Sequence, residues 1–275
     1  MKVPRPHVEV DRVKQSAFAL ADDLDAFEGD WHAHRFHQLL YAAEGALRLT
    51  TDEGTWLLPP QRAAWISASV RHRVTAPRPV ALRTVYLGAR TLPKPEFRCR
   101  VFAATPLLRE MVLGAMRWDE RRAPRDPLAR AYFAALAGLA QEWARSPGPF
   151  HLPAARGEEL GRATAWILDH LDEPLPLDAV ARAARTSVRT LTRRFHDELN
   201  LSFRDYVRAA RMLRAVELLA QPGSRVTDVA LAVGFASPSA FTAVFSGFFG
   251  EPPKDFRQTA RGVAERPGHI ESASP

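Results

Sequence analysis

Four residues in the C-terminal third of the chain, Arg189, Thr192, Arg193 and His196, share the outward face of a helix expected over about residues 187–198. Long cationic side chains and a short hydroxyl are suited to reaching guanine edges and phosphate oxygens. The helix is expected because apolar residues recur every four positions, which places them together on the opposite face. This distribution of side chains indicates a surface that contacts double-stranded DNA.

The elements that must position this face come from a spacing that occurs twice, at residues 180–195 and 229–245. Each copy reads as a short helix, a tight turn and a second helix. This order is the pattern of a helix-turn-helix, which places its second helix in the major groove of DNA. The repetition makes sequence-specific DNA binding the leading interpretation.

Cap and turn residues support both copies of the pattern. Thr186 or Ser187 is placed to cap the second helix of the first copy by accepting from its free N–H groups, and Ser237 is placed to do the same in the second copy. Gly234 permits the turn backbone, and Pro238 suits the first helical position because its missing N–H has no partner there. Both second helices are therefore expected to have a defined start.

The two copies are joined by an amphipathic helix expected over residues 203–220. At 1.5 Å per residue it would span roughly 27 Å, and successive major grooves on one side of DNA are about 34 Å apart. One rigid helix of this length could hold two DNA-reading helices near adjacent grooves. Its polar side carries Arg204, Arg208, Arg211 and Arg214, for which DNA contact and simple solvation both stay open.

Residues about 160–258 resemble the DNA-binding domain of the AraC/XylS family of bacterial transcription regulators. The resemblance is carried by residues 187–195, 211–220 and 229–245, and it continues into residues 249–257. It covers about a third of the chain and is more specific than a single helix-turn-helix pattern. It implies an all-α domain that binds DNA through the second helix of each copy.

The same resemblance implies which side chains contact DNA. The residues predicted for this role are Ser187, Arg189, Thr192, Arg193, Ser237, Pro238, Ser239, Ala240, Thr242 and Ala243. Many family members carry a basic residue where Ala243 and Ser246 stand. We therefore expect the first copy to supply most of the hydrogen-bonded readout, and the second to contribute phosphate contacts from hydroxyls and apolar contacts with thymine methyl groups. In the first turn, Arg185 stands where Gly is common in the family.

The first hundred residues have a sequence pattern typical of β structure. Short apolar runs at residues 38–43, 46–50, 55–58 and 80–87 alternate with breaks that contain Gly or Pro. Many short strands at this rhythm indicate an antiparallel sandwich or barrel.

Residues 31–45 resemble the first motif of the cupin barrel, and residues 65–74 resemble the second. The resemblance maps the pocket onto His32, His34, Gln38 and His72. Because alternate residues of a strand share a face, His32 and His34 can converge inside a barrel. Three imidazoles and an amide oxygen could hold a divalent transition metal. However, Gln38 replaces the usual Glu, and such domains in regulators often bind an effector without metal, so we expect no required cofactor and leave a metal-free polar pocket open.

A helical pattern begins after Thr105, with helices expected over residues 107–119, 126–145 and 158–171 and a linker at 146–153. We therefore predict an α+β chain in which an antiparallel, cupin-like β-barrel precedes an all-α domain with two helix-turn-helix motifs. The predicted divisions are an effector-sensing domain at 1–103, a helical connector with dimer contacts at 104–153, a double helix-turn-helix domain at 154–262 and a loose tail at 263–275.

These features predict a sequence-specific transcriptional regulator whose DNA binding is controlled by a small-molecule effector in the barrel. The expected partners are promoter DNA, the effector, a second copy of the chain in a homodimer and RNA polymerase. The alternative is a metal-dependent cupin enzyme, a dioxygenase or isomerase, with a helical appendage. Gln38 and the extent of the C-terminal resemblance favour the regulator, so we do not expect enzyme activity.

The bulk properties agree with this prediction. The net charge of +7 suits a polyanionic partner. Cys99 is the single cysteine, so no internal disulfide can form, which fits a reducing cytosol. The sequence contains no apolar stretch of about 18 residues and begins with no secretory signal, so we expect a cytoplasmic protein that does not span a membrane.

Overall fold

The computed structural model describes residues 10–89, 97–123 and 126–262, and the predicted loose tail at 263–275 lies outside the described residues. The strands are β1 (Ala17–Leu24), β2 (Phe27–Glu28), β3 (Phe36–Glu44), β4 (Leu47–Thr51), β5 (Gly54–Leu58), β6 (Arg62–Ile66), β7 (His72–Ala76), β8 (Val80–Gly88), β9 (Cys99–Ala103) and β10 (His151–Pro153). A short 3-10 helix at Val10–Arg12 precedes them. The antiparallel β structure predicted for this part of the chain is confirmed.

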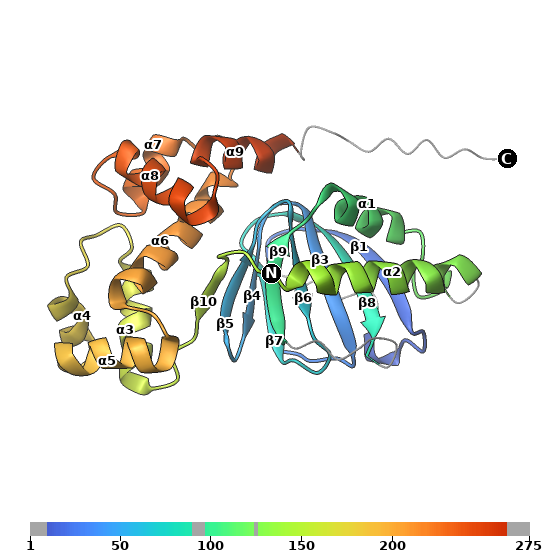
Figure 1. Ribbon diagram of the computed structural model, residues 1–275, viewed down its shortest axis with the longest axis horizontal. Helices are drawn as coiled ribbons and strands as arrows, with labels where there is room; N and C mark the ends of the chain where they lie inside the picture. Colours follow the sequence, from blue (N-terminus) through green and yellow to red (C-terminus); the bar gives the residue numbers. More distant parts are fainter. Residues whose placement is uncertain (1–9, 90–96, 124–125, 263–275) are drawn as a thin grey trace.

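The strands form two five-stranded antiparallel sheets that face each other (Figure 1). The first sheet has the order β1-β8-β3-β6-β9, and the second has the order β10-β5-β4-β7-β2. Leu40 of β3 and Leu49 of β4 are buried in the core between the sheets. The two sheets and the helices that cover them, residues 10–153, are called the sheet domain below.

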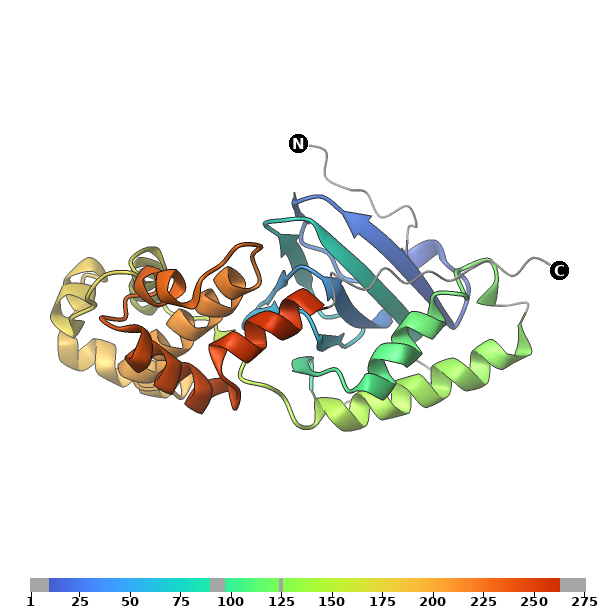
Figure 2. The same ribbon diagram turned by 90° about the horizontal axis from the view of Figure 1, so that it is seen from above.

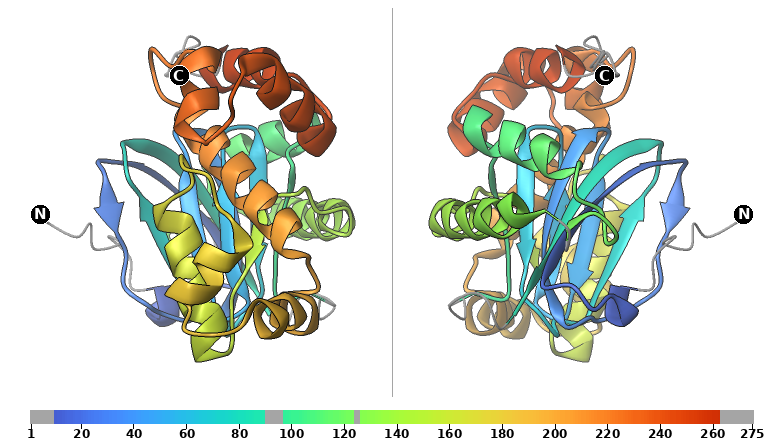
Figure 3. Two further views of the ribbon diagram at one scale, coloured as in Figure 1. Left: turned by 90° about the vertical axis from the view of Figure 1, so that its left-hand side faces the viewer. Right: turned by 90° about the vertical axis from the view of Figure 1, so that its right-hand side faces the viewer.

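Two helices, α1 (Pro106–Ala115) and α2 (Pro127–Ala144), cover the outer face of the first sheet (Figures 2 and 3). Leu39, Tyr41 and Trp65 point outward from that sheet and are buried against them. Strand β3 is therefore buried on both faces, which explains why its sequence is a continuous apolar run without alternation.

The segment 146–153 was predicted as a linker, and this is wrong for its last three residues. His151–Pro153 forms β10, which pairs with β5 and places His151 opposite Trp56. The backbone N–H of Leu57 also donates to the carbonyl of Phe150. The second sheet is thus completed by residues that come after α2 in the chain.

The C-terminal part of the chain is all helical (Figure 1). Its helices are α3 (Glu158–Asp169), α4 (Leu177–Ala183), α5 (Val188–Leu199), α6 (Phe203–Leu219), α7 (Val226–Ala232), α8 (Pro238–Phe249) and α9 (Pro253–Gly262). Helices α4 and α5 form the first helix-turn-helix, and α7 and α8 form the second. Helix α6 lies between the two, and its 17 residues span about 26 Å.

The two turns have the same backbone hydrogen bonds. The N–H of Arg185 donates to Arg182 in the first turn, and the N–H of Gly234 donates to Leu231 in the second. Both residues have a left-handed backbone, with φ of 56° at Arg185 and 75° at Gly234. Glycine adopts this conformation without cost, whereas arginine loses roughly 1 kcal/mol there. The predicted turn role of Gly234 is confirmed, and Arg185 takes the same backbone without the help of glycine.

Substitution of Gly234 with alanine is expected to lower the free energy of unfolding of the helical domain by about 1–3 kcal/mol. A Cβ at this position would lie 2.6 Å from the carbonyl oxygen of Leu171, in addition to the backbone strain. Gly247 is the matched control, since a Cβ there meets nothing within 4 Å. Gly247→Ala should be neutral or stabilising because it lies inside α8. Urea unfolding followed by circular dichroism measures both changes, and equal losses would contradict the prediction.

The stability of the protein is expected to fall as the pH drops from 7 to 5, in part through His151. Its ring stacks on Trp56 with centroids 4.1 Å apart, and burial lowers the pKa of His151 to about 4. The unfolded chain therefore takes up this proton first, so the stability is complete above pH 6.5 and is lost as the pH falls towards 4.

After allowance for the partial exposure of the ring, we expect His151 to account for about 1 kcal/mol of the loss between pH 7 and pH 5. His151→Phe keeps an aromatic ring on Trp56 but removes the titrating group. Urea unfolding at the two pH values should show a smaller loss for the variant than for the natural protein. An identical loss in both would show that His151 does not contribute.

Candidate functional site

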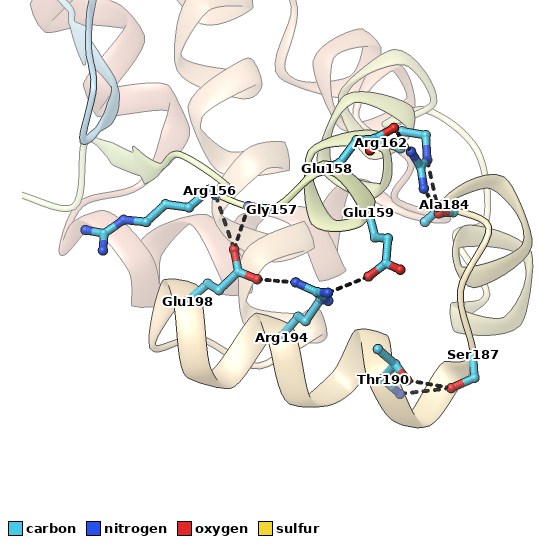
Figure 4. Close-up of polar contacts among 10 residues, drawn as sticks. All are labelled: Arg156, Gly157, Glu158, Glu159, Arg162, Ala184, Ser187, Thr190, Arg194 and Glu198. Carbon is cyan, nitrogen blue, oxygen red and sulfur yellow. Dashed lines mark hydrogen bonds and ion pairs between the residues drawn. The ribbon is translucent and has the colours of Figure 1, made fainter.

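Helix α5 presents the face that the sequence predicted. Ser187 is its cap, with Oγ accepting from the N–H of Thr190 at 3.1 Å (Figure 4). Leu191 and Phe195 are fully buried. The side chains on the opposite face are exposed, namely Arg189, Thr192, Arg193 and His196. Neither Arg189 nor Arg193 forms a hydrogen bond or ion pair with any residue that the structure describes, so both guanidinium groups can reach an external partner.

The inner side of α5 is anchored by a charged network. Arg194 forms ion pairs with Glu159 at 2.7 Å and with Glu198 at 2.9 Å (Figure 4). Glu198 accepts the backbone N–H groups of Arg156 and Gly157, which precede α3. A carboxylate at a helix N-terminus is stabilised by the free N–H groups and by the helix dipole. This network fixes α5 against α3 and so fixes the direction in which its exposed arginines point.

The sequence reasoning did not identify the anchoring network. The spacing of Arg194 and Glu198, four residues apart on one helix, is a signal that could have found that pair. The contacts with Glu159 and Gly157 depend on how α3 and α5 pack, which no local spacing reveals. The turn that precedes α5 is held in a similar way, because Arg162 of α3 donates two hydrogen bonds to the carbonyl of Ala184.

Helix α8 is built in the same way but carries different chemistry. The Oγ of Ser237 accepts from the N–H of Ala240 at 3.2 Å, and Pro238 is the first helical residue. Phe241 and Phe245 are fully buried. The predicted contact residues that are exposed are Pro238, Ser239, Ala240 and Ala243, while Ser237 and Thr242 are half-buried. This face therefore offers hydroxyl and methyl groups and no cation.

Helix α6 does not present a uniform row of arginines. Arg204 and Arg208 are exposed, whereas Arg211 is turned inward. Arg211 donates to the carbonyls of Leu171 at 3.0 Å and Glu173 at 2.7 Å, which lie beyond the end of α3. It therefore ties α6 to the segment between α3 and α4, and its guanidinium lies 6.0 Å from the ring centroid of Phe235 in the second turn.

A cleft of about 1040 Å³ separates the two helix-turn-helix units. Thr192 of α5 and Leu231 of α7 both line it, together with Phe203 and Val207 of α6. Helices α5 and α8 are called the reading helices below. They belong to the two units that this cleft separates, and α6 lies between those units.

In the sheet domain, three predicted pocket residues lie close together. The ring centroids of His32 and His72 are 4.3 Å apart, and those of His34 and His72 are 5.2 Å apart. One nitrogen of each ring lies within 4.8 Å of the others. Residues 32 and 72 also exchange two backbone hydrogen bonds, which brings the distant segments into register. His34 and His72 are buried, and His32 is exposed at the edge of the cluster.

The three rings share one orientation. Each Nδ1 lies 2.9 Å from a backbone carbonyl two residues away, at Asp30, Phe36 and Val70 respectively. Because a carbonyl only accepts, each Nδ1 is the donor, and the Nε2 of each neutral ring keeps a free lone pair. Burial lowers the pKa of His72 to about 3 and also lowers the pKa of His34, so these rings stay neutral.

The donor set fits a metal ion as well as a polar ligand. The Nε2 of His72 is buried and has no hydrogen-bond partner among the described residues. The Oε1 of Gln38 lies 3.1 Å from the Nε2 of His34. Two acceptors about 3 Å apart are the spacing of neighbouring ligands on one transition metal with bonds of about 2.1 Å. All four predicted pocket residues therefore point to one region of the sheet domain.

Aromatic residues line one side of this region. Tyr86 lies 5.4 Å from His34 between ring centroids and is within hydrogen-bond distance of the Gln38 amide, 3.4 Å. Phe18 stacks on Tyr86 at 4.9 Å, and Phe36 packs edge-on against Phe18. The sequence reasoning did not assign Phe18 and Phe36 to the pocket. A signal was available for Phe36, because it lies two residues before Gln38 on the same strand face.

Cys99 is fully buried, and burial raises the pKa of its thiol, which makes it an inert group. No helix within the described ranges is long and apolar enough to cross a bilayer.

Comparison with known proteins assigns a family to each half of the chain. Residues 16–146 match the model of the AraC-like ligand binding domain, and residues 180–259 match a model described as a helix-turn-helix domain. The HTH-type transcriptional regulator NimR of Escherichia coli strain K12 is 29% identical over 241 residues, which cover 86% of this chain and 85% of NimR.

The helical domain has relatives of its own. The regulatory protein SoxS of Escherichia coli strain K12 is 34% identical over 93 residues, which are 34% of this chain and 87% of SoxS. A crystal structure of a transcriptional regulator with an AraC-type DNA-binding domain from Chromobacterium violaceum is 28% identical, covers 37% of this chain and 91% of its own, and has a TM-score of 0.36. The sheet domain, the paired helix-turn-helix units, the two family models and the sequence relatives NimR and SoxS lead to one conclusion. The chain belongs to the AraC family of transcriptional regulators, with an N-terminal ligand-binding domain and a C-terminal helix-turn-helix domain that binds DNA.

Proposed function

We propose that this regulator recognises its promoter chiefly through α5, while a small effector is bound beside His34 and His72. The observation that carries the first part is the state of Arg189 and Arg193, which are exposed and unpaired among the described residues on a helix whose other side is anchored. An arginine guanidinium can donate two hydrogen bonds to the O6 and N7 atoms of guanine, which serine and alanine cannot do.

Helix α8 has a supporting role in this proposal. Its exposed Ser239 and Ala243 suit phosphate contacts and the methyl group of thymine. The two reading helices are held by one helix of about 26 Å, which is shorter than the spacing of about 34 Å between successive major grooves. Simultaneous contact therefore favours DNA that bends towards the protein.

We also propose that the pocket senses a ligand and does not catalyse a reaction. This is supported by the match of residues 16–146 to the AraC-like ligand binding domain. The Nε2 of His72 is buried and has no hydrogen-bond partner among the described residues. This supports a divalent transition metal held by the three histidines, with Gln38 beside it. Such an ion would supply a Lewis-acidic centre to which an oxygen of the effector can bind. A metal-free polar pocket is the competing form of the same proposal.

The remaining proposed partners are a second copy of the chain and RNA polymerase. We infer that the protein acts as a homodimer in the cytoplasm, with α1 and α2 as the contact surface. Leu107 of α1 and Leu128 of α2 support this, because each exposes more than half of its surface to solvent, 55% and 56%. A contact with RNA polymerase stays a prediction for which no surface is assigned.

The unequal roles of the reading helices can be tested with single substitutions. On a fragment identified by genome-wide footprinting, Arg193→Ala is expected to weaken binding by about 10–100-fold, because it removes a bidentate contact. Ser239→Ala should weaken binding less, by about 2–5-fold, because it removes one hydrogen bond whereas Arg193→Ala removes two. Arg83→Ala is the control, since Arg83 pairs with Asp23 in the sheet domain. An equal or larger loss of specificity for Ser239→Ala would overturn the proposed order.

The metal form of the pocket can be tested without knowing the effector. Dialysis against Zn²⁺ or Co²⁺ followed by elemental analysis should leave one equivalent on the natural protein. His72→Ala should lower the affinity at least about 10-fold, and Gln38→Glu should raise it by supplying an anionic ligand. His196→Ala is the control, because His196 is exposed on α5. If the natural protein retains no more metal than its His72→Ala variant, the pocket works without metal.

A further inference from the structure

The helical domain contacts the second sheet through a buried carboxylate. Arg48 on the outer face of β4 forms a two-point ion pair with Glu217 of α6, in which the Nη2–Oε2 distance is 2.6 Å. The Glu217 side chain is only 10% exposed, and it also accepts from Arg214 at 3.0 Å. Figure 1 shows α6 beside the strands β4, β5 and β10. A bidentate pair of this kind constrains direction as well as distance.

A second contact holds the end of α8. Arg62 of β6 pairs with Glu251 at 3.2 Å, and its guanidinium lies 5.2 Å from the ring centroid of Phe150. Phe150 is buried and stacks on Phe249, the last residue of α8, with centroids 5.2 Å apart. The sheet domain thus holds the end of α8 that is opposite its DNA-reading start.

These contacts lie where a small movement is amplified at the DNA-reading end of α8. Glu217 lies near the C-terminal end of α6, next to the second helix-turn-helix. Helix α8 has 12 residues and is about 18 Å long, so a small rotation at Phe249 displaces Ser239 at the other end by several times the movement at the contact.

The same strand pair also carries the pocket. Strands β4 and β7 are hydrogen-bonded, with Thr51 opposite His72 and Arg48 opposite Thr75. His72 points into the sheet domain, whereas Arg48 points out of it towards α6. Three residues of one strand, about 10 Å, separate the two positions. A ligand that draws His72 towards His32 therefore acts on the strand pair that supports Arg48.

We propose that the Arg48–Glu217 pair is the joint through which ligand binding in the sheet domain changes the placement of α8. The proposal rests on the proposed function, since it requires the pocket to bind an effector. Arg48 is a positioning residue and touches neither the effector nor DNA. Removing it leaves the Glu217 carboxylate buried with Arg214 as its remaining described partner, so the docked arrangement loses its directional contact.

The test uses the full-length protein and hydrogen–deuterium exchange, because coupling is reciprocal and DNA must act on the pocket if the pocket acts on DNA. The probe is the footprinted DNA fragment. In the natural protein, DNA is expected to slow exchange in β4 and β7 by at least about 5-fold. In Arg48→Ala this change should fall below about 2-fold while the fragment still binds.

Three further variants complete the design. The conservative substitution Arg48→Lys should keep more of the effect of DNA on β4 and β7 than Arg48→Ala does, because the ammonium group can still pair with Glu217, which also keeps its contact with Arg214. Arg83→Ala should behave as the natural protein does. In the free protein, Arg48→Ala and Glu217→Gln should both speed exchange over residues 214–221, which reports on the joint directly.

The outcomes separate the two proposals. If DNA leaves β4 and β7 unchanged in the natural protein, or protects them equally in Arg48→Ala, the joint is overturned although DNA binding stands. If no genomic fragment binds above random competitor, the proposed function fails first, and the joint fails with it.

Discussion

The burial of α6 is the constraint on which the rest of the DNA-binding half depends. Tyr206 and Ala215 lie on opposite sides of this helix, Met212 and Val216 lie between them, and all four are buried. Each side packs against a different neighbour, so the helix cannot rotate without breaking contacts on every side. The distance and direction between the reading helices follow from this element together with the contacts that the sheet domain makes with Glu217 and Phe249. Their own apolar residues, such as Phe195 and Phe245, only fix how each helix sits on that support.

Much of this half could be predicted because its determinants are local. The four-residue spacing of Leu191 and Phe195 is a direct consequence of a helix with one buried face. The position of Gly234 in the turn follows from its backbone conformation, and the serine caps follow from the free N–H groups at a helix start. Such features are determined by a few neighbouring residues, and the structure confirms the turn at Gly234 and the helices α5 and α8.

The features that could not be predicted arise from contacts between distant segments. Arg211 looked like one more cation on a polar face, but carbonyls beyond the end of α3 draw it inward. Strand β10 is three residues long and too short to show alternation. In the candidate pocket, the identities of His32, His34 and His72 came from a family resemblance. The common orientation of their rings depends on backbone carbonyls whose positions only the folded sheets define.

Strand β10 has a practical consequence for dividing the protein. The second sheet receives its last strand from residues directly before the DNA-binding half, so a fragment cut at the end of α2 would leave β5 as an unpaired edge. Exposed edges of this kind readily recruit strands from other molecules and lead to aggregation. An isolated ligand-binding fragment should therefore keep the chain through Pro153, and the natural cut lies between that residue and the start of α3.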